Sequence, residues 1–173
     1  MNLFRLSNDP IEAAQLNQDL HVRKILLENC QLLANCFSIN QLQNAPHTQT
    51  GNVRKYSHIH HPISHYVRAT KGNYNWALKH GLALCEEFKY RFDKPHFCEG
   101  FIQWAANNNP EMVKEGEETE FPQCFKQYPE CHVAGNPVAG YKNYYRKAKK
   151  SFDMRGKRVE ANWTKREVPE FMR

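Results

Sequence analysis

The stretch DLHVRKILLENCQLLANC, residues 19–36, decides the fold class. Its apolar side chains recur at steps of three and four residues, which is the period of one buried face of an α-helix. The residues that mark this face are Val22, Ile25, Leu26, Asn29, Leu32, Leu33 and Cys36. The stretch therefore predicts a helix with one face in the core, and the fold class that we expect is mainly α.

Other segments repeat the helical period or carry helix-start signals. Asp9 suits an N-cap position and Pro10 a first helical turn, so a helix should begin at about Pro10. The remaining patterns predict helices at 63–70, 73–92, 97–106 and 138–152, with polar, proline-containing loops at 41–55 and 111–135.

The length and composition indicate one folded unit. A chain of 173 residues, 40% hydrophobic and 12% aromatic, can bury a single core. We expect a compact single-domain helical bundle over 1–173 that opens with a short extended segment. Residues 111–135 should form a long surface loop, and 153–173 a C-terminal tail packed on the bundle.

The charge balance favours a polyanionic partner. Lys and Arg number 24 against 18 Asp and Glu, which gives a net charge of +6 and attracts nucleic acid. No stretch approaches the roughly 20 apolar residues of a membrane span, and no signal peptide opens the chain. We expect a cytoplasmic, monomeric protein without a membrane partner, whose six cysteines are reduced and packed as small apolar residues.

A polar stripe runs beside the apolar face of the helix at 19–36. His21, Lys24 and Glu28 lie three and four residues apart, so their side chains share one side of the helix. A carboxylate beside a histidine and a lysine at the rim of a core is suited to acid and base catalysis. The alternative is a solvated helix face with an internal salt bridge.

Basic and aromatic residues alternate in two places. The segment 140–150 interleaves three tyrosines with five basic residues, a mixture that can neutralise phosphates and stack on bases. The alternative is that one tyrosine face packs into the core. A second patch lies at 91–96. The residues that we expect to contact nucleic acid are Arg5, Arg23, His61, Arg68, Arg91, Lys94, His96, Tyr141, Tyr145, Arg146 and Lys149.

A histidine cluster lies between the polar loop and the next helix. Histidine is the commonest transition-metal ligand, so His58, His60, His61 and His65 raise the question of a metal site. Their spacing does not indicate converging ligands with supporting partners. We expect phosphate contacts and helix capping here and no metal. A metal-dependent nuclease is the less favoured alternative.

The motif Asp19-Leu-His21, with Glu28 seven residues later, follows a short apolar segment. A turn at Pro62 and a helix over 73–92 that ends in the basic-aromatic YRFDK come next, and Trp163-Thr-Lys-Arg166 lies near the end. Over about its first 95 residues this pattern resembles the phage-type pyrimidine-dimer DNA glycosylases called endonuclease V, and a group of small phage proteins similar to them.

The resemblance implies a compact helical fold with the start of the chain in the active site. In that family the terminal α-amine attacks the sugar C1′ to form a Schiff base, and a glutamate assists. By this resemblance Met1 would supply the amine, Glu28 the carboxylate and His21 the motif histidine, with Lys24 beside them and no cofactor. An α-amine has an ordinary pKa of about 7.7–8.0 against about 10.4 for lysine, so more of it is neutral and nucleophilic.

These observations lead to two hypotheses from different classes. The first is a DNA base-excision enzyme, an N-glycosylase with abasic-site lyase activity, that acts on an extruded damaged or modified nucleotide of duplex DNA. The alternative is a noncatalytic nucleic-acid-binding protein with the same fold, in which Glu28 has a structural role.

Overall fold

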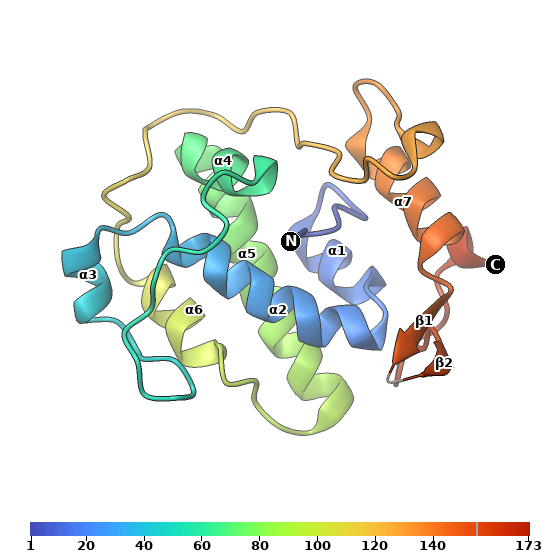
Figure 1. Ribbon diagram of the computed structural model, residues 1–173, viewed down its shortest axis with the longest axis horizontal. Coiled ribbons are helices and arrows are strands. Elements are labelled where there is room, and N and C mark those ends of the chain that lie inside the picture. Colours follow the sequence, from blue (N-terminus) through green and yellow to red (C-terminus); the bar gives the residue numbers. More distant parts are fainter. Residues whose placement is uncertain (155) are drawn as a thin grey trace.

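The computed structural model describes residues 1–154 and 156–173, and it confirms the mainly helical class. Helix α5 (Lys71–Phe92) lies at the centre and contacts α1 (Pro10–Leu16), α2 (Asp19–Ala34), α4 (Pro62–Ala69) and α6 (Glu99–Ala106) (Figure 1). The other elements are α3 (Ile39–Gln43), η1 (Pro129–Cys131), α7 (Pro137–Ala148), β1 (Ser151–Met154), β2 (Lys157–Glu160) and η2 (Glu170–Met172).

The predicted helix starts have the expected chemistry. The Asp9 side chain accepts a hydrogen bond from the Ile11 amide, and Pro10 occupies the first turn of α1. Helix α5 begins at the Thr70 cap and ends where Asp93 takes the left-handed conformation, at φ +54°. These helices and the long α2 are therefore confirmed close to their predicted bounds.

Two segments differ from the predictions. The loop at 41–55 overlaps α3, because Ser38 and Gln41 form a capping box that starts a five-residue helix. The helix at 138–152 was too long: α7 ends at Ala148, and Ser151 to Met154 pair antiparallel with Lys157 to Glu160. Gly156, at φ +77°, provides the left-handed backbone that this chain reversal uses.

The long segment between α6 and α7 arches over the bundle (Figure 1). Part of it is tied to the start of α5: the amides of Lys71 and Gly72 donate to the carbonyls of Lys114 and Gly116. Asn73 adds side-chain hydrogen bonds to Thr119. Hydrogen bonds from α5 therefore hold residues 114–119 of this segment in place.

Gly72→Ala is expected to destabilise the protein by about 1–3 kcal/mol, because the added methyl group would collide with the backbone of Glu118. Gly100→Ala in α6 is the matched control, since a Cβ there meets no atom within 4 Å. The control should raise stability by up to about 1 kcal/mol through helix propensity. Urea unfolding measures both variants, and equal stabilities would contradict the close approach.

The buried apolar side chains form one cluster that includes Leu3 and Leu6 near the start of the chain and Trp163 near its end. The Trp163 indole donates to the carbonyl of Leu16 at 3.0 Å. Within the described residues, no helix combines the length and apolarity that crossing a bilayer requires. The tail thus lies against α1 through Trp163, and the start of the chain lies against α2, where the Asn2 amide donates to Glu28.

Candidate active site

A small polar cavity of about 200 Å³ opens between the N-terminal segment, α2 and α7. Helix α2 supplies His21, Lys24 and Glu28 from one face, as their spacing predicted. The other lining residues are Met1, Asn2, Phe4, Ile25, Cys124, Tyr144 and Lys149. The structure therefore brings the four predicted catalytic residues, Met1, His21, Lys24 and Glu28, to one cavity.

The start of the chain is held against Glu28. The α-amine of Met1 lies 4.0 Å from Glu28 Oε2, and the amide of Asn2 donates to the same oxygen at 2.7 Å. On the other carboxylate oxygen, Lys24 Nζ lies 3.8 Å from Oε1. Glu28 is 13% exposed and Lys24 is 64% exposed, so the carboxylate is sheltered while one of its partners reaches solvent.

The turn that positions the Met1 amine beside Glu28 depends on Asn2 and Phe4. Phe4 has a positive φ of +45°, which is rare for a residue with a bulky side chain. The Asn2 side chain holds this turn: its oxygen accepts from the amides of Leu3 and Phe4, and its nitrogen donates to the Cys124 carbonyl. A strained backbone held by several hydrogen bonds indicates that the position of the terminus is specified.

His21 orients its neighbours and is almost fully buried, at 4% exposed. Its ring stacks on Phe4 with centroids 4.3 Å apart, and its Nδ1 hydrogen-bonds the Tyr145 hydroxyl. Because that hydroxyl donates to Asn17, it accepts from Nδ1, which assigns the proton of a neutral imidazole to Nδ1. Burial, followed by repulsion from Lys149 and Lys24, lowers the pKa of His21 well below 6.5, so the ring is uncharged at neutral pH.

Six of the residues predicted to contact nucleic acid are at least partly accessible. Arg23, Lys94 and Arg146 are exposed, whereas His61, Arg68 and Lys149 are half-buried. Of these, Lys149 lines the cavity itself. Burial lowers the pKa of His61, and repulsion from the positive chain terminus and from His58 lowers it further. Attraction to Glu28 acts in the opposite direction, as expected for a ring beside the site.

Two arginines predicted to bind nucleic acid are buried in ion pairs, and the prediction is corrected for both. Arg5 pairs with Glu118 and lies over the Trp76 ring. Arg91 has no exposed side-chain surface and pairs with Glu87 and Asp19. A guanidinium that is buried in an ion pair inside the protein is not available to a phosphate.

The prediction of a surface position is also wrong for three residues with ring side chains, which lie in the core. Tyr141 and Tyr145 are fully buried, since residues four apart share a helix face, and that face packs inward. His96 is 9% exposed, accepts from the Cys98 amide and packs on Phe88. The alternative for the tyrosine-rich segment, a face packed into the core, therefore holds for these two tyrosines.

The sequence patterns missed Tyr144, Phe4 and Cys124. Tyr144 is the tyrosine of α7 that borders the cavity, and its position three residues after Tyr141 and next to Tyr145 gave no spacing signal that separates it from them. Phe4 belonged to an apolar segment that gave no hint of its ring stacking on His21. Cys124 lies in a long loop without local periodicity, so no signal placed it here.

The histidine cluster caps a helix. The His61 ring accepts from the Ile63 amide at the start of α4, and the rings of His60 and His65 lie 6.3 Å apart. Across residues 1–154 and 156–173, no group of three or more His, Cys, Asp or Glu side chains is arranged to hold a metal ion. All six cysteines are free, and all but Cys124 are buried.

A second and larger cavity, of about 820 Å³, lies between α1, α5, α6 and the C-terminal tail. Its lining includes Leu82 and Ala83 together with the acidic side chains of Glu86, Glu87 and Glu99, which disfavour a polyanion. The smaller cavity is therefore the better candidate for nucleic-acid chemistry. No family model, curated protein or solved structure matches this chain.

Proposed function

We propose that this protein is a DNA base-excision enzyme of the endonuclease V type, an N-glycosylase with abasic-site lyase activity. One observation carries the proposal: the terminal amine of Met1 and the carboxylate of Glu28 lie 4.0 Å apart in a polar cavity. A weakly basic amine beside a carboxylate is the pair that nucleophilic attack with proton transfer requires.

The chemistry follows from this pair. The neutral amine attacks C1′ of an extruded nucleotide, and the bond from C1′ to the base breaks as the base leaves with the electron pair and takes up a proton from water. Glu28 accepts a proton that the attacking nitrogen loses and passes it to the ring oxygen O4′, whose bond to C1′ breaks to give a protonated imine. The Glu28 carboxylate then removes a C2′ proton and the 3′ phosphate leaves, which nicks the strand.

The size and surroundings of the cavity suit this substrate. At about 200 Å³ it is smaller than the roughly 300–1,000 Å³ of pockets for drug-sized ligands, so it accommodates a sugar-sized group. The exposed cations Arg23 and Arg146 lie on the two helices that border it, and they could hold the flanking phosphates. The net charge of +6 supports the same partner.

Borohydride trapping on duplex DNA with one abasic site tests the proposal. An imine between protein and sugar is reduced to a stable adduct, so wild-type protein should give one covalent complex. Base release is measured separately, on ultraviolet-irradiated duplexes and on duplexes with single modified bases. Absence of a trapped complex would remove the lyase activity, and absence of base release from every duplex would remove the glycosylase.

A further inference from the structure

The candidate cavity is lined by two lysines besides the chain terminus, and Lys149 is the less exposed of the two. Lys149 directly follows the last residue of α7, and its amide donates to the Tyr145 carbonyl at 2.9 Å. Its side chain lines the same cavity as Met1 and Glu28. The Met1 and Lys149 amines, which are 148 residues apart in the sequence, therefore border one small space.

The ammonium group of Lys149 lies among aromatic rings. Its Nζ is 5.0 Å from the ring centre of Tyr144, 5.8 Å from that of Phe152 and 5.9 Å from that of Phe4. Among the residues that the structure describes, no carboxylate pairs with it. Lys24, the other lysine at the cavity, is largely exposed and lies 3.8 Å from Glu28.

Burial and the nearby Lys24 favour the neutral amine, whereas the aromatic rings attract the ammonium form. Burial, and then repulsion from Lys24, lowers the pKa of Lys149, while Tyr128 and Glu28 act in the opposite direction. A lysine that is partly desolvated and close to another cation is the kind that forms Schiff bases with carbonyl carbons. Lys24 is thus better placed to lower the pKa of Lys149 than to act as a nucleophile itself.

We infer that Lys149 is a second covalent nucleophile, which captures the aldehyde of an abasic sugar in DNA. The neutral Nζ attacks C1′ of the open-chain sugar, a bond from nitrogen to carbon forms, and the carbonyl oxygen leaves as water after taking up two protons. The product is an imine, and water reverses the reaction. The inference rests on the proposed function for its substrate, since hydrolysis of the imine that base excision forms leaves this aldehyde.

The test maps the reduced adduct. Wild-type protein is treated with borohydride on duplex DNA with a preformed abasic site, and the modified peptide is identified by mass spectrometry. We expect an adduct on Lys149 Nζ. In protein whose Met1 α-amine has been acetylated, trapping should persist, and Lys149→Arg, which keeps the charge, should lower it by about tenfold or more.

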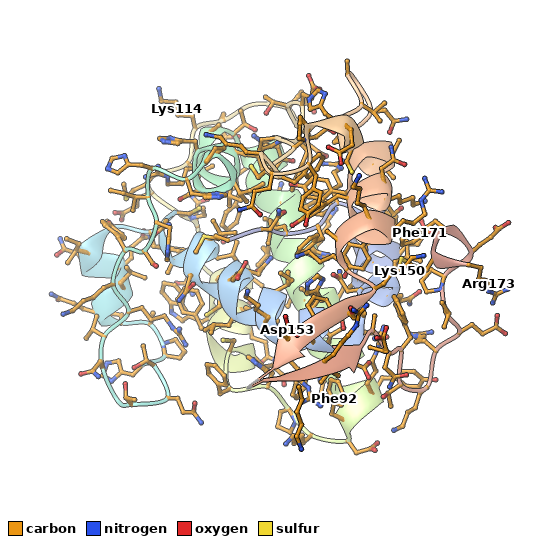
Figure 2. The ribbon with its side chains drawn as sticks, turned by 45° about the vertical axis from the view of Figure 1, so that its right-hand side comes forward. Phe92, Lys114, Lys150, Asp153, Phe171 and Arg173 are labelled. Carbon is orange, nitrogen blue, oxygen red and sulfur yellow. The ribbon has the colours of Figure 1, made fainter. Side chains whose placement is uncertain are left out.

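Lys150→Arg is the matched control, because Lys150 is the neighbouring lysine, is exposed and does not line the cavity. Figure 2 labels it between α7 and β1. Its trapping yield should equal that of wild type. An adduct found only at other amines, equal yields for Lys149→Arg and wild type when Met1 is acetylated in both, or no adduct would overturn the inference. If Lys149→Arg does not fold, the peptide map of wild type still decides.

The two proposals can fail separately. Preformed abasic DNA bypasses base release, so an adduct on Lys149 without base release from any damaged duplex would support this inference and remove the glycosylase. Base release with an adduct at Met1 alone would support the proposed function and overturn the role of Lys149.

Discussion

Glu28→Gln is expected to lower the rate of base release by about 100- to 10,000-fold, which is the usual range for loss of a general acid or base. The glutamine oxygen can still accept the hydrogen bond that the Asn2 amide donates to Glu28. The start of the chain should therefore stay in place while the proton acceptor beside the amine is lost. Single-turnover kinetics on a damaged duplex measures the rate, and melting confirms that the variant is folded.

Glu86→Gln is the matched control for this change. Glu86 is 73% exposed, pairs with Lys89 and lines the larger cavity. Its loss should leave the rate of base release unchanged. If wild type and Glu28→Gln bind DNA equally and neither releases a base, the noncatalytic nucleic-acid-binding protein becomes the better hypothesis, with Glu28 as an anchor for Asn2.

The site elements that local sequence determines were predictable. The apolar period over 19–36 fixes which side of α2 faces the core, and His21, Lys24 and Glu28 follow on the adjoining side. Met1 joined them only through the resemblance to a family. Its position beside Glu28 depends on the turn at Phe4 and on the contact of Asn2 with Cys124, more than 120 residues away.

The wrong predictions of nucleic-acid contacts have a common physical cause: charge and aromaticity do not reveal burial. The segment at 91–96 looks like a basic surface patch, but the Arg91 side chain lies inside the protein and pairs with Asp19. The local pattern could not show this pairing, because Asp19 lies 72 residues earlier. The hairpin was missed because its strands are four residues each and follow a strongly basic helix, where the helical pattern continues. Pairing between such short strands is settled by tertiary contacts.

The ion pairs around Arg91 stabilise the fold, so breaking them is expected to lower the stability of the protein strongly. Its Nε lies 2.7 Å from Glu87, its Nη1 3.0 Å from Asp19, and its Nη2 donates to the Gln15 carbonyl. Burial alone would raise the pKa of Glu87, but hydrogen bonds from Arg166 and Arg91 hold it below its ordinary value. The carboxylate is thus charged inside the protein, and its stabilising contribution is present at neutral pH and is lost as the pH falls below about 4.5.

Arg91→Met is expected to destabilise the protein by about 3 kcal/mol, because it leaves two sheltered carboxylates without their shared cation. Arg166 still pairs with Glu87. The loss of stability should therefore lie at the lower end of the range of about 3–5 kcal/mol that is typical when a buried ion pair is broken. For a chain of this length, the melting temperature should fall by about 6–12 °C at neutral pH. The difference from wild type should shrink as the pH falls below about 4.5 and Glu87 takes up a proton.

Arg146→Met makes the same chemical change on the surface of α7, where the guanidinium is exposed and donates to Asn143. Its stability should stay within about 0.5 kcal/mol of wild type. Under the proposed function the substitution should instead weaken DNA binding. It should also reduce by about one the slope of the logarithm of the binding constant against the logarithm of the salt concentration. Arg91→Met, measured below its melting temperature, should bind DNA as wild type does. Full stability of Arg91→Met would contradict the buried network, and weakened DNA binding by the folded variant would return Arg91 to the nucleic-acid interface.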